Sequence, residues 1–494
     1  MISSQRDINV IVAGAMLTLF LAALDQTIVA TALTKIAADL GDVHLIAWVV
    51  SAYLLTATCT MPISGKVSDI YGRRPMLIVA LAVFLTGSLI SANAPSMAFL
   101  IAGRAVQGMG GGAMMTLSQT IVGDVVAPRE RGRYAGYFAT VFAGSAVLGP
   151  VIGGFVTYYI GWRFIFWINL PLGVLAFFIT NRALKRMPVQ RRPARVDYLG
   201  VVLFAAGATA LLLALSGGGV MFPWTSPILL AALAAAAILG GLFVKRQMDV
   251  PEPILPPKFF ADAVIGPTYL ALFCLFGSYL AVIVMVPIFL QVAKGIPVNE
   301  VGMLLIPLTL TTATVASLTG RYTRRSGRYK PPALFSLPLA VAALLTLAAT
   351  IHQISPLGIA ALLMVMGVGV GPIFPTSTLA VQNAASRGDL GAVTGGLGFS
   401  RMLGGAVMTA AASSLVLGLA AEWVPGLGGV SGLQDLVRKP LDAAQRAELI
   451  DVFAILILGL AGMIALGWAL FWRIAERPLQ DSKDFAAAER EKAA

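Results

Sequence analysis

Apolar stretches of membrane-spanning length recur along almost the whole chain of 494 residues. A helix needs about 20 mostly apolar residues to cross the hydrocarbon core of a bilayer. Fourteen stretches meet this condition, at 10–31, 45–64, 75–93, 97–121, 134–157, 163–183, 198–216, 226–244, 264–290, 299–319, 332–351, 355–378, 391–417 and 450–472. Because helices satisfy their own backbone hydrogen bonds inside lipid, we predict an all-α integral membrane protein with fourteen transmembrane helices.

The amino-acid composition excludes most other classes of protein. Hydrophobic residues make up 58% of the chain and charged residues 12%, whereas a soluble protein is roughly 25% charged. So few charges could not cover the surface of a soluble protein of this length, which excludes disorder, a disulfide scaffold and nearly every soluble enzyme fold. Cys59 and Cys274 both lie in apolar stretches, so we expect no disulfide, metal site or cofactor.

The distribution of Lys and Arg predicts the orientation of the chain. If the N-terminus is cytoplasmic, 27 of the 35 basic residues fall in cytoplasmic segments and five in outer segments. Cytoplasmic loops of membrane proteins carry such an excess. We therefore predict a multi-pass protein of the cell (inner, cytoplasmic) membrane with both termini in the cytoplasm. The net charge of +12 then reflects orientation, with membrane lipids as partners and no nucleic acid.

Two loops of the chain have related sequences. Residues 65–74 read GKVSDIYGRR and residues 320–329 read GRYTRRSGRY, so a Gly-Arg pair follows the first glycine by seven residues in both. A second match, Arg131-Gly132 with Arg387-Gly388, occurs at nearly the same offset. Transporters are often built from internal repeats of this kind. We predict two pseudo-symmetric six-helix bundles with two inserted helices.

This organisation divides the chain into four parts. The expected domains are an N-terminal bundle over 1–190, an inserted helix pair with flanking loops over 191–262, a C-terminal bundle over 263–475 and a cytoplasmic tail over 476–494. An outer loop, 419–449, has apolar residues near helical spacing. It is open whether this segment lies on the outer headgroups or gates the substrate.

Charged residues inside the spans point to a mechanism, because a charge in a bilayer is costly unless it is paired or hydrated. Asp25 and Arg104 each lie about six or seven residues from the outer end of a span, roughly 10 Å deep. They are candidates for an ion pair that protonation of Asp25 would release, or for a static structural bridge. Arg401 lies mid-span without an acid at matching depth, which leaves Asp25, backbone carbonyls, an anionic substrate group or plain packing open.

Glycines and a proline mark the span at 134–157. Gly144, Gly149, Gly153 and Gly154 leave a bare strip on which another helix can approach closely. Pro150 removes a backbone hydrogen bond and favours a bend. We interpret this segment as a flexible seam on which the two halves rock.

The loop after the second span combines glycines with charges. Gly65 and Gly72 suit a tight turn, and Asp69 lies near Arg73 and Arg74. An acid among cations can form an ion network that holds one conformation closed. A loop that only sets the topology is the alternative.

Several of these segments resemble signatures of the major facilitator superfamily. The loop 65–74 matches G-x-x-x-D-x-x-G-R-R at every fixed position, and 100–108 (LIAGRAVQG) is similar to the span-4 motif. Residues 149–154 (GPVIGG) resemble the span-5 antiporter motif. The segments LDQTIV (24–29), WRFIFWINLP (162–171) and DYLG (197–200) are similar to signatures of the fourteen-helix drug:H⁺ antiporter branch.

The resemblance implies a major facilitator fold and proton-coupled antiport by alternating access, with amphipathic or cationic drugs and toxic compounds as exported substrates. It implies Asp25 as the proton-coupling acid, Arg104 as its partner and Asp69 in a cytoplasmic gate, with no cofactor and a monomeric protein. Export of an endogenous lipid, siderophore or metabolite is the alternative, and a membrane enzyme or a proton-pumping complex subunit is a further one. Arg324 stands where the first half has Asp69, so any charge gate is asymmetric.

Overall fold

The computed structural model describes residues 5–42, 45–185, 196–218, 224–427, 436 and 441–479. Over these ranges the chain is helical and contains no β-strand. The first part comprises α1 (Gln5–Ile28), α2 (Leu33–Leu40), α3 (Ile46–Tyr71), α4 (Arg73–Ala92), α5 (Met97–Val125), α6 (Pro128–Tyr159), α7 (Phe164–Trp167) and α8 (Asn169–Leu184). The middle part comprises α9 (Tyr198–Gly217), α10 (Pro227–Asp249) and α11 (Pro257–Ala261). The last part comprises α12 (Ile265–Val292), α13 (Val298–Ser326), α14 (Lys330–Thr350), α15 (Pro356–Val370), α16 (Ile373–Ala384), α17 (Leu390–Trp423) and α19 (Ala443–Arg473).

Short sequence signals set the helix ends that matter for the site. α3 ends at Gly72, whose φ of 96° is one that residues with a Cβ avoid, and α4 begins at the next residue. α13 ends in the same way at Gly327, which is left-handed with a φ of 71°. The Ser96 hydroxyl accepts a hydrogen bond from the Phe99 N–H and caps α5. The two tight glycine turns hold the charged ends of α3 and α13 in place.

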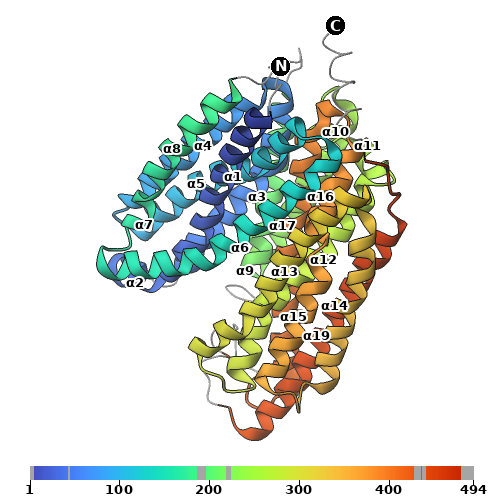
Figure 1. Ribbon diagram of the computed structural model, residues 1–494. Coiled ribbons are helices and arrows are strands. Elements are labelled where there is room, and N and C mark those ends of the chain that lie inside the picture. The colour runs from blue at the N-terminus through green and yellow to red at the C-terminus, as the bar shows by residue number, and fades with distance from the viewer. Residues whose placement is uncertain are drawn as a thin grey trace.

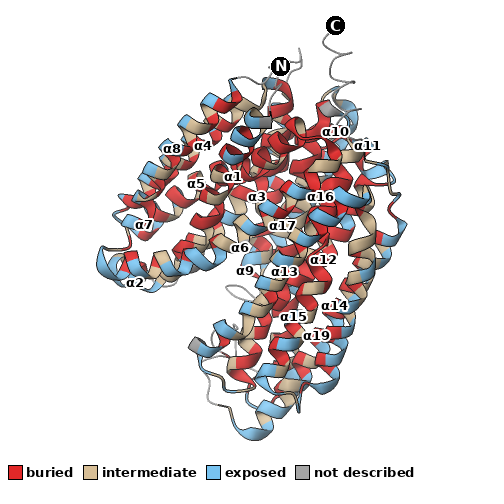
Figure 2. Cartoon of the chain, viewed as in Figure 1, coloured by how far each residue is buried: buried red, intermediate tan, exposed pale blue. Residues whose placement is uncertain are grey.

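The helices form two bundles with separate hydrophobic cores (Figure 1). α1 and α3–α8 make the first bundle, with α5 packed against α1, α3 and α4, and α12–α17 with α19 make the second. Large apolar side chains remain exposed, among them Val151, Phe155, Phe178 and Phe335, and exposed positions run along helices of both bundles (Figure 2). A soluble protein rarely exposes so much apolar surface, and lipid is the solvent that suits it.

Twelve helical segments of the described chain are long and apolar enough to cross a membrane. They coincide with twelve of the fourteen predicted spans. The other two predictions, 45–64 and 97–121, fall on α3 and α5, which are not among the twelve. α5 contains Arg104, Gln107 and several glycines, which lower its apolar content. The all-helical membrane architecture is confirmed, while the count of fourteen transmembrane helices stays a prediction.

The bundles meet mainly at two helix pairs, α3 with α17 and α6 with α13, and α16 with α6 and α17 with α5 make smaller contacts. Gly65 lies against Gly391 in the first pair and Gly320 against Gly132 in the second, so closely that a Cβ on Gly65 or Gly320 would overlap the partner's carbonyl. Gly65 and Gly320 open the two related loops, so the sequence repeat corresponds to two equivalent contacts. Both lie at the end of the molecule where α1 begins and α19 ends, which we call the terminal end (Figure 1). The bundles diverge toward the other end.

The inserted helices α9 and α10 pack against each other, and α9 also packs beside α3 and α17. The Phe204 ring of α9 lies 5.0 Å from Phe399 of α17 and 5.2 Å from Phe243 of α10, measured between ring centroids. Cys59 of α3 belongs to the same apolar cluster. The pair therefore covers the α3–α17 junction, on one side of the molecule.

The predicted domain limits stay predictions, since the 190/191 boundary and residues 480–494 of the tail lie outside the described residues. The outer loop is shorter than the predicted 419–449, because α17 continues to Trp423 and α19 begins at Ala443. A capping box starts α19, with the Asp442 carboxylate accepting from the Gln445 N–H and the Gln445 side chain accepting from the Asp442 N–H. The prediction used apolarity alone, which does not register helix that continues beyond the bilayer.

Candidate functional site

Asp25 of α1 and Arg104 of α5 form a buried ion pair inside the first bundle. Arg104 Nη1 lies 2.5 Å from Asp25 Oδ2, and both side chains are fully buried. The two charges predicted at similar depth are thus in direct contact. Pairing explains how both are tolerated there, because a single buried charge left without its partner is strongly destabilising.

Two amides that sequence reasoning missed complete this site. Gln107 Nε2 and Asn169 Nδ2 each donate a hydrogen bond of 2.8 Å to Asp25 Oδ1. Both also donate to Ser88 Oγ, and Arg104 Nη1 donates to Gln107 Oε1 at 2.6 Å. The Asp25 carboxylate is therefore held by donors from α5 and α8, and Ser88 of α4 holds the two amides in place. An amide inside an otherwise apolar span is the sequence signal that could have located both residues.

A third helix, α3, is attached to the arginine of the pair. Arg104 Nε donates to the Val49 carbonyl at 3.2 Å, and the guanidinium lies 4.4 Å from the centroid of the Tyr53 ring. The Tyr53 hydroxyl in turn donates to the Ala22 carbonyl of α1 at 3.2 Å. A desolvated cation–π contact contributes about 2 kcal/mol. The position of α3 is therefore linked to that of the Arg104 side chain.

The glycine-rich segment of α6 packs against α1 beside the ion pair. A Cβ on Gly149 would overlap the Thr27 hydroxyl, and one on Gly153 would also overlap α1. Thr27 Oγ1 donates to the Ser145 carbonyl at 2.8 Å. Pro150 lies inside α6, five residues after Ser145, and has no N–H to donate within the helix. The motif thus brings α6 onto α1 two residues from the carboxylate.

This packing corrects the prediction of a seam between the two halves. The close glycine contacts join α6 to α1 of the same bundle. Gly144 and Gly154 have no atom within 4 Å of where a Cβ would lie. Glycine spacing indicates where a helix can be approached, but the tertiary structure decides which helix approaches.

Asp69 connects the two bundles at the terminal end of α3. Its two carboxylate oxygens accept hydrogen bonds from the backbone N–H groups of Gly391 (2.9 Å) and Ala392 (2.8 Å). These groups belong to the first turn of α17, where free N–H groups and the helix dipole favour a negative charge. Arg73 lies 2.6 Å from Asp69 and 2.6 Å from Asp124. The predicted ion network is present, and backbone amides are its partners across the bundles.

The other residues of this loop act within or beside that contact. Gly65 lies against Gly391, and Gly72 makes the turn into α4. Arg74 Nη2 donates to Asn181 Oδ1 of α8 at 2.8 Å, which keeps it inside the first bundle. Arg74 is therefore separate from the contact between the bundles.

The equivalent contact between α13 and α6 has the opposite charges. Arg324, which corresponds to Asp69, lies 3.0 Å from the Glu130 carboxylate. Arg129 donates to the Arg324 carbonyl at 3.0 Å and to the Arg325 carbonyl at 3.2 Å, in the last turn of α13, where cations are favoured. The Arg324–Glu130 pair is partly exposed and contributes at most about 1 kcal/mol. The two contacts differ in their partners, since Asp69 accepts from backbone N–H groups whereas Arg324 pairs with the carboxylate of Glu130.

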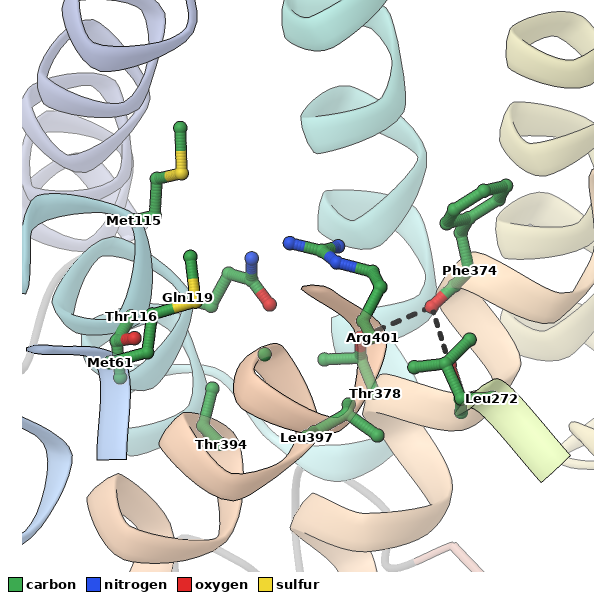
Figure 3. A pocket seen from close by; sticks show the side chains of 12 residues that line it. Met61, Met115, Thr116, Gln119, Leu272, Phe374, Thr378, Thr394, Leu397 and Arg401 are labelled. Atoms are coloured by element: carbon green, nitrogen blue, oxygen red, sulfur yellow. Dashed lines mark hydrogen bonds between the residues drawn. The ribbon is translucent and has the colours of Figure 1, made fainter. Parts of the chain in front are cut away.

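Arg401 lies in a small pocket between the bundles. The pocket has a volume of about 10 Å³, and its lining residues are Met61, Met115, Thr116, Gln119, Leu272, Phe374, Ser377, Thr378, Thr394, Leu397, Gly398 and Arg401. Figure 3 shows the guanidinium pointing across the pocket toward Gln119. Arg401 Cζ lies 6.0 Å from the Phe142 ring centroid and 5.6 Å from that of Phe276. Contact with Asp25, one of the predicted alternatives, is not formed.

Comparison with known proteins places the chain in a family. It matches the Major Facilitator Superfamily over residues 15–409. The chain belongs to this superfamily. It is 33% identical over 399 residues to Multidrug transporter protein MdtP of Bacillus subtilis, with 80% of this chain and 73% of that protein covered. It is 33% identical over 416 residues to Efflux pump dotC of Dothistroma septosporum, with 83% and 71% covered.

The fold has a counterpart among solved structures. The proton:xylose symporter XylE has a TM-score of 0.65 and 14% sequence identity, with 96% of this chain and 97% of that chain covered. At this identity the likeness concerns the fold alone. The chain is thus a multi-pass membrane transporter of the major facilitator fold whose relatives include named multidrug transporters and efflux pumps.

Proposed function

We propose that this protein is a proton-coupled antiporter that exports amphipathic compounds across the cell membrane by alternating access. The observation that carries the proposal is the fully buried Asp25 carboxylate, held by Arg104 and two amides deep in the first bundle. An acid in a membrane helix is costly, and a transport protein that binds and releases protons has a use for one. The named multidrug and efflux relatives support export as the direction.

Protonation of Asp25 would remove the charge that holds Arg104. The guanidinium would then have only the Gln107 oxygen, the Val49 carbonyl and the aromatic rings as partners. Loss of the proton would restore the attraction. The site therefore has two arrangements that differ by one proton, which is what a coupling acid requires.

α3 offers a route from this site to the contact between the bundles. It meets Arg104 at Val49 and Tyr53, and it carries Asp69 about 30 Å further along at 1.5 Å per residue. Asp69 binds the first turn of α17 in the second bundle. Movement of α3 after protonation would weaken that contact and open the terminal end.

We further propose that both termini face the cytoplasm. The excess of basic residues at that side supports this orientation. In this arrangement the bundles of the structure are joined on the cytoplasmic side, so the conformation is closed to the cytoplasm. Release of the Asp69 contact would convert it to one that receives substrate from the cell.

The test is Asp25→Asn in proteoliposomes that carry an imposed pH gradient. We expect gradient-driven transport to be lost, while exchange of substrate down its own gradient continues and the protein stays folded. Asp39→Asn is the matched control, because Asp39 is an exposed outer carboxylate 2.6 Å from Arg163. Hydrogen bonds from Trp162 and Arg163 hold the pKa of Asp39 below its usual value, so it does not titrate in the assay range. Undiminished gradient-driven transport by Asp25→Asn would remove Asp25 from the coupling role.

A further inference from the structure

We propose that the pocket between the bundles binds the anionic group of an amphipathic cargo, and that Arg401 is the residue that recognises it. The inference rests on the proposed transport function and adds to it the charge of the cargo. The resemblance implied amphipathic or cationic substrates, so an anion is a different expectation. Four features of the structure carry it.

The first feature is that Arg401 lacks the partners that its guanidinium needs. A guanidinium carries five N–H donors and is always charged in proteins. In the described part of the chain Arg401 makes no ion pair and no hydrogen bond, and its Nε is buried without an acceptor. Arg104, the other arginine deep in a span, has a carboxylate, an amide oxygen and a carbonyl. The Arg401 side chain is half-buried, and its unmet buried Nε donor is unfavourable, so a ligand that supplies an acceptor there would gain binding energy.

The second feature is the chemistry of the pocket wall. Arg401 is the only charged residue among the described lining residues, and none of them is a carboxylate. Hydroxyl and amide groups alternate with methionine, leucine and phenylalanine side chains. A cationic cargo would meet a like charge in a medium of low dielectric, where repulsion is strong. A carboxylate, sulfonate or phosphate would pair with the planar guanidinium through two parallel hydrogen bonds.

The third feature is that the pocket is built from both bundles. α3 and α5 supply one wall and α12, α16 and α17 supply the other (Figure 3). The size of the pocket therefore depends on the position of the two bundles relative to each other. At about 10 Å³ it has room for roughly one water in this conformation. Opening of the α3–α17 contact would widen it. A site that is collapsed in one state and open in the other is what release of cargo requires.

The fourth feature is a basic groove on the side that the inserted helices do not cover. The groove lies between α6 and α13 near the terminal end and has a volume of about 1100 Å³. Its charged lining residues are Arg129, Glu130, Arg133, Arg321, Arg324 and Arg325. Helix α6, which lines this groove, also carries Phe142, whose ring lies beside Arg401. An anionic amphiphile would therefore meet positive charge in the groove as it approaches and again at Arg401 in the pocket.

Two dyes with a common xanthene core and opposite charge test the proposal. Fluorescein is the anion and rhodamine 123 the cation, and binding to the purified full chain is measured by fluorescence polarisation. We expect saturable binding of fluorescein, at least tenfold tighter than that of rhodamine 123. Tighter binding of rhodamine 123, or no saturable binding of fluorescein, would overturn the proposal.

Substitutions of Arg401 test whether this side chain causes the preference for fluorescein. Arg401→Gln should weaken fluorescein binding at least tenfold and leave rhodamine 123 unchanged or better bound, and Arg401→Lys should fall between because it keeps the charge but not the planar fork. Arg473→Gln, which removes an exposed arginine at the end of α19, should bind as wild type. Wild-type fluorescein affinity in both folded Arg401 variants would refute the assignment.

Two further measurements identify the source of the anion and separate substrate binding from proton coupling. Competition by phosphatidylglycerol but not phosphatidylcholine would identify an anionic lipid as the cargo, while competition by neither would identify a free organic anion. Both results support the anionic site. Asp25→Asn should still bind fluorescein saturably and in preference to rhodamine 123 while it loses gradient-driven transport, so failure of the coupling proposal is distinguishable from failure of this one.

Discussion

Replacing Asp69 with Asn removes the charge from the carboxylate that joins α3 to the first turn of α17. Its hydrogen bonds to the Gly391 and Ala392 N–H groups, 2.9 and 2.8 Å long, each contribute about 1.5–3 kcal/mol because the acceptor is charged. An Asn oxygen recovers one neutral bond of about 0.5–1.5 kcal/mol, and its NH₂ group faces the second N–H. The conformation with joined terminal ends should lose about 2.5–4.5 kcal/mol, which shifts the equilibrium about 70- to 2000-fold toward opening.

The distance between spin labels at the terminal ends of the two bundles measures this shift. Lys185, directly after α8, and Arg473, at the end of α19, are exposed and belong to different bundles. The native cysteines, Cys59 and Cys274, are both buried and are first replaced with serine. We expect wild type to show mainly the short distance and Asp69→Asn mainly a longer one.

Asp124→Asn is the matched control for this measurement. Asp124 lies 2.6 Å from Arg73, as Asp69 does, but it makes this ion pair inside the first bundle. Its loss should leave the wild-type distance distribution unchanged. The reasoning is falsified if Asp69→Asn keeps the wild-type distribution, or if Asp124→Asn shifts it equally.

Three further predictions concern packing, the ion-pair site and pH. Gly149→Ala places a methyl group against α1 and should lower stability by about 1–3 kcal/mol and slow transport, whereas Gly154→Ala fills open space and should change neither; equal effects in thermal unfolding would contradict this. Asn169→Leu removes one of three hydrogen bonds to the buried carboxylate and should cost about 1–3 kcal/mol in denaturant unfolding, and a wild-type midpoint would argue against the geometry. Burial raises the pKa of Asp389, but hydrogen bonds from Lys258 and a neighbouring serine outweigh it and leave the pKa below its usual value. The stabilisation is then present at neutral pH and is lost as pH falls from about 4 through the native pKa, so Asp389→Asn should be less stable than wild type at pH 7 and this deficit should shrink as the pH falls below about 4; a deficit that stays constant down the whole acid range would count against it.

The two contacts between the bundles place charges of opposite sign at helix ends. At the α3–α17 junction an acid meets the N-terminus of a helix, and at the α6–α13 junction an arginine meets a helix C-terminus. Helix dipoles favour both arrangements. Inserted helix α9 packs beside the first junction, whereas a groove lined by α6 and α13 lies at the second.

The sequence by itself determined the class of the protein, the positions of its helices and the residues with unusual charge. These are local properties: a run of 20 apolar residues favours a membrane helix whatever it packs against, and an acid inside such a run is visible as an exception. The repeat at an offset of about 255 residues likewise needs no structure to detect. Asp25, Arg104 and Arg401 were found as such exceptions, and Asp69 was found through the glycine-flanked loop 65–74.

The tertiary structure alone decided which of these residues meet. Asp25 is bound by residues 79, 82 and 144 positions away, and Asp69 by backbone groups more than 320 positions away. The spacing of Gly149 and Gly153 permitted several partners, and packing selected α1 rather than the other half. Arg401 had four possible roles until its surroundings showed aromatic rings and no carboxylate. Pairing between distant helices depends on how whole surfaces fit, and no local pattern encodes that fit.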